Sequence, residues 1–131
     1  MALKMNVLLR NARLDAITTF AGASALLRIY DGVQPATGGA ATTLLAELVC
    51  NATFAPAAAS GVLTLNAVAN DASANATGTA TWARIVKADG TTHVTDMTVG
   101  TSGTDLILAT VSIVAAAVVS VTSATVTEAN A

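Results

Sequence analysis

The sequence predicts an all-β fold, an antiparallel, jelly-roll-like β-sandwich of about 6–8 strands with one short helix near the N-terminus. Thr and Val, which favour the half-buried surface of a strand, are abundant, and only 3% of the residues are aromatic. Short apolar runs recur at roughly ten-residue spacing, separated by Gly, Pro, Asn and Asp. The 131 residues suit a single domain, with the helical segment in about 1–22 and the sandwich in about 23–128.

The helix is predicted in RNARLDAITTFAG, residues 10–22. Asn11 is a candidate N-cap, and Gly22 is placed to end the helix in a left-handed conformation. Apolar residues at three- and four-residue steps predict the buried face: Leu9, Ala12, Ala16, Ile17 and Phe20. A helix of about three turns is marginal alone in water, so we expect it to pack against the sandwich or a neighbour.

Strands are predicted in ALLRIYDG, which ends in an Asp31-Gly32 turn, in TTLLAELVCN, and in VLTLNAVA from Val62. The run from Leu106 to Thr127 is too long for one strand, so we expect a break near Ala115–Ala117 and a final pair of strands. The part of this run up to Val121 is too short for a membrane helix and lacks flanking Lys or Arg, which argues against a membrane span.

The segment GTATWARIVKADGTTHV, which begins at Gly78, predicts a hairpin. Asp89-Gly90 suits the positive φ angles of a tight turn between two strands. Trp82 is expected to anchor the core, because few other large side chains are present. His93 follows the turn, and the Gly100–Gly103 string is expected to form the next corner.

The sequence gives no signal for an enzyme or a cofactor. His93 and Asp96 lie three residues apart, which on a regular strand places their side chains on opposite faces. The Gly100–Gly103 string leads into a strand with no Lys nearby, unlike a phosphate-binding loop. The oxygen-rich turn from Asp71 has too few carboxylates for a helical calcium loop. Cys50 is alone, so no disulfide or ordinary zinc site can form within one chain.

Charge narrows the classes of partner. The formal net charge is −2, and only 11% of residues are charged, against roughly 25% in average domains. No basic stripe indicates nucleic acid. A surface so poor in charge favours association with partners or with copies of itself. Cationic residues lie early in the chain, which leaves open either a basic and an acidic pole or merely scattered charge.

The order of several motifs is distinctive: IYDGVQPA, ATGTATWARIVKADGTT and VGTSGTDL. Together they resemble small structural proteins of tailed-bacteriophage virions, over nearly the whole chain, and in particular capsid decoration or cement proteins. The resemblance implies a non-enzymatic virion protein, made in the bacterial host cytoplasm, on the capsid surface. It implies two kinds of partner, the major capsid protein and other copies of itself in a homodimer or homotrimer, without nucleic acid or membrane.

The early arginines are the candidate docking residues for an acidic capsid surface: Arg10, Arg13 and Arg28. Two other classes remain open. One is a tail, neck or baseplate protein that uses the same sandwich. The other is a receptor- or glycan-binding module, which predicts an exposed aromatic side chain such as Trp82 in a groove.

Overall fold

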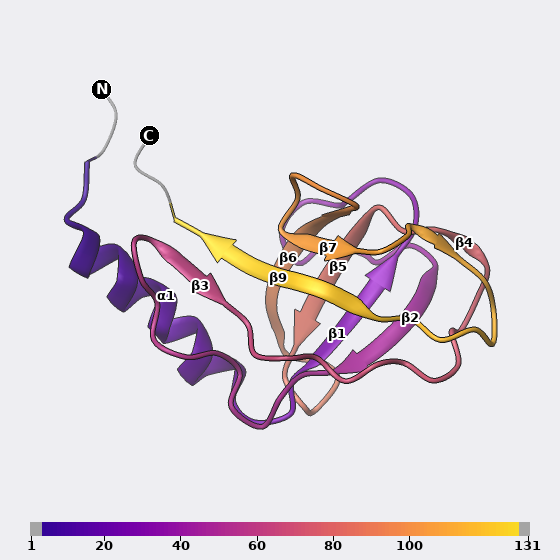
Figure 1. Ribbon diagram of the computed structural model, residues 1–131, viewed down its shortest axis with the longest axis horizontal. Coiled ribbons are helices and arrows are strands. Elements are labelled where there is room, and N and C mark those ends of the chain that lie inside the picture. The colour runs from indigo at the N-terminus through magenta and orange to yellow at the C-terminus, as the bar shows by residue number, and fades with distance from the viewer. Residues whose placement is uncertain (1–3, 129–131) are drawn as a thin grey trace.

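A computed structural model describes residues 4–128 and shows a mostly β chain with one helix (Figure 1). The elements, in chain order, are α1 (Val7–Ala21), β1 (Leu26–Tyr30), β2 (Leu44–Val49), β3 (Val62–Thr64), β4 (Gly78–Thr79), β5 (Trp82–Val86), β6 (His93–Gly100), β7 (Leu106–Leu108), β8 (Ser112–Ile113) and β9 (Val121–Thr127). The described residues therefore hold nine strands, seven of them in one sheet.

The main sheet has the order β2-β1-β5-β6-β7-β9-β3, and β4 pairs with β8 in a separate two-stranded sheet. All pairs are antiparallel except β6 and β7, which run parallel through Val99–Leu106 and Gly100–Ile107. The sheet is therefore mixed, and the prediction of a purely antiparallel sheet is wrong. Only two residue pairs form the parallel contact, so the short connection 101–105 can join β6 to β7 without a crossover helix.

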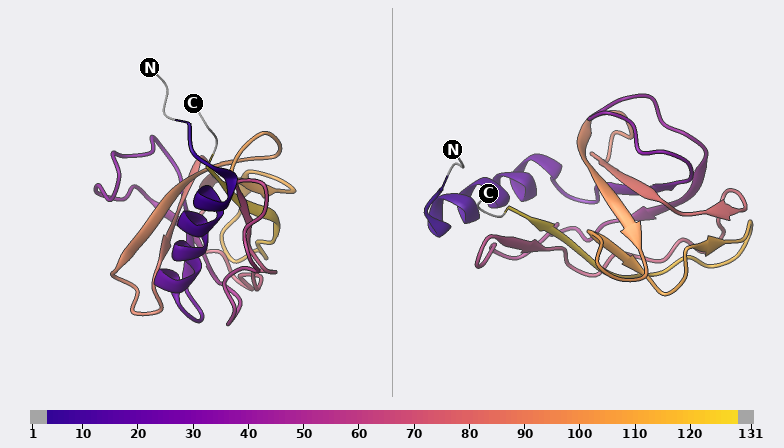
Figure 2. Two further views of the ribbon diagram at one scale, coloured as in Figure 1. Left: turned by 90° about the vertical axis from the view of Figure 1, so that its left-hand side faces the viewer. Right: turned by 90° about the horizontal axis from the view of Figure 1, so that it is seen from above.

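The sheet bends, so that β9 crosses in front of β1 and β5 (Figures 1 and 2). The main apolar cluster has members on both parts of the bent sheet, including Ile29, Leu45 and Ile85 on one part and Leu63 and Leu106 on the other. Ala116 has φ 69° in the connection between β8 and β9, where the long apolar run was expected to break. The run forms three strands, however, and not the expected pair.

The helix begins earlier than predicted. Asn6, and not Asn11, is the N-cap, and its side chain accepts a hydrogen bond from the Leu8 amide at 2.8 Å. The Asn11 side chain accepts from the Gly61 amide at 2.9 Å instead, which ties the helix to the start of β3. Gly22 has φ 70° and ends the helix as predicted.

The predicted buried face of α1 is largely wrong. Leu14 and Ala21 are its buried residues, and Ile17 is partly buried against the core. Four members of the predicted face are exposed: Leu9, Ala12, Ala16 and Phe20. Because α1 carries apolar residues on both sides, the three- and four-residue pattern fits two different faces, and contact with β3 and β6 selects one of them.

Loop 31–43, between β1 and β2, lies on the side of β1 and β5 that faces away from β9 (Figure 2). Its two ends are paired, because the Asp31 amide donates to the Thr43 carbonyl at 3.2 Å and the Thr43 amide donates to the Asp31 carboxylate at 3.0 Å. The outer face of the sheet is thereby partly covered by a glycine-containing loop.

Candidate functional site

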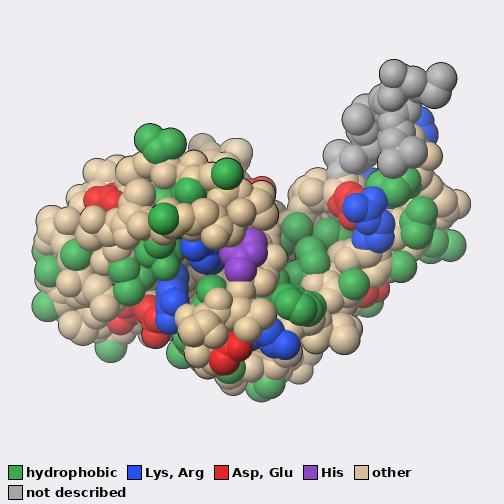
Figure 3. Space-filling model, turned by 180° about the vertical axis from the view of Figure 1, so that it is seen from behind, with side chains coloured by type: hydrophobic (Ala, Val, Ile, Leu, Met, Phe, Trp, Pro, Cys, Tyr) green, Lys and Arg blue, Asp and Glu red, His purple; other side chains and the backbone are tan. Residues whose placement is uncertain are grey.

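A row of four charged residues crosses the outer face of the sheet. Each of β2, β1, β5 and β6 contributes one residue, in the order Glu47, Arg28, Arg84 and Asp96, and neighbouring members are direct partners in the strand register. Arg28 Nε lies 2.7 Å from Glu47 Oε2, and Arg84 Nε lies 2.7 Å from Asp96 Oδ1. Basic side chains and the histidine are seen together on this face in Figure 3.

The Asp96 end of the row is nearly closed to solvent and holds loop 31–43. The side chains of Arg84 and Asp96 are only 12% and 6% exposed. Asp96 Oδ2 accepts from the Gly38 amide at 3.2 Å, and Arg84 donates to the Gly39 carbonyl at 2.8 Å. The ion pair therefore has backbone partners on the loop, and these satisfy polar groups that burial would otherwise leave without water.

The environment of this pair favours its charged form. Burial opposes ionisation of Asp96, but hydrogen bonds from Arg84, the Gly38 amide and His93 outweigh it and hold the pKa of the carboxyl below its usual value. The hydrogen bond to Asp96 raises the pKa of Arg84. The Arg84–Asp96 ion pair and its hydrogen bonds to Gly38 and Gly39 thus hold loop 31–43 on the sheet, and we call them the latch.

His93 joins the latch, and the prediction that it lies opposite Asp96 is wrong. Its Nε2 is 3.1 Å from Asp96 Oδ1. Ile85 pairs with Thr95 but Val86 pairs with His93, so Val94 is an extra residue in β6. Such a bulge breaks the two-residue alternation and turns His93 to the face that carries Asp96.

Trp82 is fully buried on the same outer face, outside the main apolar cluster. Its ring stacks on Tyr30 with centroids 4.5 Å apart, and the Arg84 guanidinium lies 5.1 Å from its centroid. Its Nε1 donates to the Asp31 carbonyl and to Thr42 Oγ1, both at 3.0 Å. Trp82 thus anchors loop 31–43 to the sheet.

Asp89 and Gly90 lie in the connection between β5 and β6, which is longer than a two-residue turn. The Gly90 amide donates to the Lys87 carbonyl at 2.9 Å, and only Gly90 of the two has a positive φ, 77°. The Asp89 carboxylate accepts from the side chain and amide of Thr92 and from the amide of Thr91, which lowers its pKa. Both residues specify the turn.

The three candidate docking arginines all have partners within the chain. Arg10 donates to the Glu128 carbonyl at 3.0 Å, and Arg13 lies 2.6 Å from the Glu128 carboxylate. Arg28 belongs to the charge row and donates to the Gly90 carbonyl at 3.0 Å. Early cations thus meet a late anion, so the two ends of the chain do not form separate basic and acidic poles.

Two further residues considered for a metal site, Asp71 and Cys50, have structural roles. Asp71 accepts from the amides of Glu47 and Ser73, both at 3.0 Å. Cys50 is buried, and burial raises the pKa of its thiol to about 11. Within residues 4–128, no group of three or more His, Cys, Asp or Glu side chains is placed to hold a metal ion.

Sequence reasoning missed the charge row and the latch. A signal was present, because β1, β2 and β5 each carry a single charged residue in an otherwise apolar strand. A lone charge in such a strand indicates a partner on the neighbouring strand.

No family model, curated protein or solved structure matches this chain. Among the described residues, no helix is long and apolar enough to span a membrane.

Proposed function

We propose that the chain is a non-enzymatic structural protein of a tailed-bacteriophage virion, a decoration protein that binds the outer capsid shell and bridges its subunits. The β-rich chain, as a jelly-roll-like sandwich, supplies a rigid body. Copies of the protein bind the major capsid protein and each other. The protein is made in the bacterial host cytoplasm and functions on the virion. The motifs IYDG, ATGTATWARI and VGTSG carry the resemblance on which this assignment rests.

The structural observation that best supports the proposal is how charge and apolar surface are distributed. Arginines are paired within the chain, whereas Leu8, Val33 and Val118 are among the large apolar side chains left exposed. Such a surface can be buried in a protein interface with little loss of charge hydration. Many modest contacts, repeated over a shell, make opening of the lattice more costly.

Among the docking candidates, Arg13 suits a role at the capsid best, because its side chain is half exposed in spite of its bond to Glu128. Arg10 and Arg28 are more deeply engaged in internal contacts. We therefore assign the polar part of capsid docking to Arg13.

The test is to add the purified protein to shells that lack it and to measure shell melting by calorimetry and bound density by electron microscopy. We expect a higher shell melting temperature and hundreds of copies per particle. Arg13→Ala should weaken shell binding, and Arg28→Ala is the matched control that leaves it unchanged. Absence of both added density and a melting shift would refute the decoration role.

A tail, neck or baseplate component is the second candidate. Its support is the placement of apolar surface at both ends of an elongated molecule, which suits a ring (Figure 1). Copy number separates the two, because a decoration protein covers the shell in hundreds of copies, whereas a closed ring in a tail or neck holds only about six or twelve. A glycan-binding module has less support, because the buried Trp82 ring offers no exposed platform.

A further inference from the structure

The outer face of α1 is an apolar ridge. Leu8 is 73% exposed, Leu9 51% and Phe20 49%, and Ala12 and Ala16 between them are also exposed. These five side chains are uncharged, and the Lys87 ammonium lies 4.8 Å from the centroid of the Phe20 ring at one end of the ridge. In Figures 1 and 2 the helix and β3 project to one side of the bent sheet, so the ridge lies at one end of the molecule.

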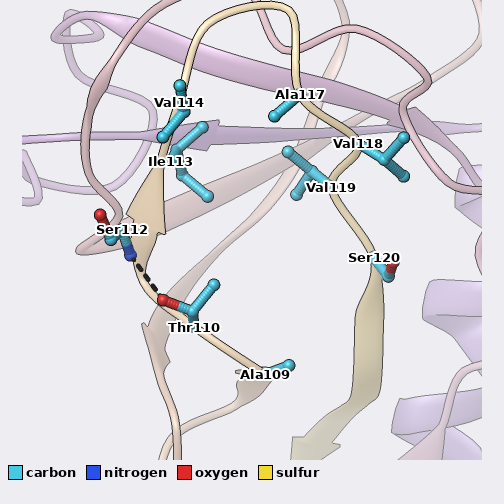
Figure 4. Close-up of a pocket in the computed structure, with 9 residues that line it drawn as sticks. All are labelled: Ala109, Thr110, Ser112, Ile113, Val114, Ala117, Val118, Val119 and Ser120. Atoms are coloured by element: carbon cyan, nitrogen blue, oxygen red, sulfur yellow. Dashed lines mark hydrogen bonds between the residues drawn. The ribbon is translucent and has the colours of Figure 1, made fainter.

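The opposite end of the molecule carries a cavity. It is lined by nine residues between Ala109 and Ser120, and its volume is about 250 Å³. These residues lie on two arms of the chain, one formed by β8 and the end of the connection before it and the other by the connection from β8 to β9. Figure 4 shows the Ile113 and Val119 side chains between the two arms. Val114 and Val118, at 56% and 62% exposure, extend the apolar surface outside.

The ridge and the cavity are both apolar, and their shapes are complementary. None of the nine lining residues is charged, and the Lys87 ammonium lies at the Phe20 end of the ridge, so a contact made through Leu8 and Leu9 removes no charge from water. One surface is convex and the other concave. An apolar protein cavity of about 150 Å³ accepts benzene, so this larger one has room for a phenyl ring or an isobutyl group. It is below the roughly 300 Å³ at which drug-sized ligand pockets begin, which favours a side chain as occupant.

We propose that copies of this chain associate head to tail, with the α1 ridge of one copy seated in the 109–120 cavity of the next. Because two different patches meet, the contact is heterologous and generates a ring or a filament instead of a closed pair. The proposal adds to the proposed function the surfaces through which copies meet. It concerns the isolated protein, so it stands or fails without reference to a shell.

The experiment uses sedimentation velocity of the purified full chain over a concentration series. The wild type should form species larger than a dimer as concentration rises. Leu8→Glu on the ridge and Val118→Glu at the cavity should each raise the dissociation constant at least about tenfold, because each buries a charge in an apolar contact. Val33→Glu is the matched control, since Val33 is also a highly exposed apolar residue, at 85%, but lies in loop 31–43; it should associate like the wild type.

Mixing the two monomeric variants gives the decisive result. Leu8→Glu retains a normal cavity and Val118→Glu a normal ridge, so an equimolar mixture should form a one-to-one dimer that grows no further. A monomeric wild type, a mixture that stays monomeric, or a Val118→Glu variant that associates normally would each overturn the proposal. Leu9→Glu and Val114→Glu replace any variant whose circular dichroism shows misfolding.

Discussion

Loop 31–43 and helix α1 both cover parts of the sheet, but they differ in how much apolar surface they leave exposed. The loop is held by hydrogen bonds, an ion pair and the Trp82 ring, and the charged groups beneath it have partners. The helix is also held by polar contacts, from Asn11 to the Gly61 amide and from Arg13 to Glu128, but it buries only a narrow apolar stripe around Leu14. Its other side exposes large apolar residues. The loop region is therefore complete within one chain, whereas the helix has a further surface suited to a partner.

Trp82→Ala tests the loop region most severely. Removal of a fully buried tryptophan leaves a cavity and removes the Nε1 hydrogen bonds to the Asp31 carbonyl and Thr42, so the free energy of unfolding should fall by about 4 kcal/mol. Urea denaturation measures this loss. Phe20→Ala, at the half-exposed aromatic residue on α1, should change stability by less than about 1 kcal/mol. Equal losses would show that the two regions do not differ as described.

Leu14→Ala and Leu8→Ala compare the two sides of α1 with the same substitution. Leu14 is 1% exposed, so its truncation should cost about 3 kcal/mol. Leu8 lies on the outer ridge, and its truncation should change the stability of the monomer by no more than about 0.5 kcal/mol. Thermal unfolding at a concentration where the protein is monomeric measures both values. A large loss for Leu8→Ala would mean that the ridge is internal to the fold.

Asp96→Asn weakens the latch and should lower stability by about 2 kcal/mol at neutral pH, because the Arg84 guanidinium loses its counter-charge and an amide nitrogen that can only donate replaces one of the two accepting oxygens. The pKa of Asp96 is lowered by folding. Its contribution is therefore present above the carboxyl's unfolded pKa, about 3.9, and is lost as pH falls through the lower folded value. Urea denaturation from pH 7 to pH 2 should show this acid loss in the wild type and a smaller one in the variant. If the free energy of unfolding fell equally steeply in both proteins, the loss of stability in acid would have to come from other carboxylates.

Gly90→Ala should cost about 1 kcal/mol, less than the change at Asp96, because φ at this position is 77° and an added Cβ would lie 3.2 Å from Arg28 Nη2. Gly103→Ala is the matched control: φ is 68°, but no atom lies within 4 Å of its Cβ. The difference between the two variants in thermal unfolding measures how tightly the β5–β6 connection packs on the charge row. Identical values would mean that Arg28 moves aside freely.

Local sequence patterns located most of the elements. The predicted strands around Arg28, Glu47 and Arg84 and the helix end at Gly22 are all present. These features depend on residues close together in the chain, namely apolar runs, glycine conformations and turn residues. The start of α1 was missed because Asn6 and Asn11 are both competent N-caps.

The candidate site was harder to predict from the sequence, because its geometry depends on partners distant in sequence. The bulge at Val94 arises only when β6 pairs with β5, and it brings His93 to Asp96. The expected regular alternation put these two residues apart. In the same way, no local pattern indicates that Glu128 meets Arg10 and Arg13.

The sequence by itself determined a β-rich chain with one short helix, because apolar spacing and turn residues act over a few neighbouring positions. Only the tertiary structure decided which face of α1 is buried, on which side of the sheet Trp82 lies, and that β6 and β7 run parallel. The physical reason is that strand pairing and helix docking choose between faces that are equally apolar. That choice is made by contacts between distant segments, and in α1 it leaves the second apolar face exposed.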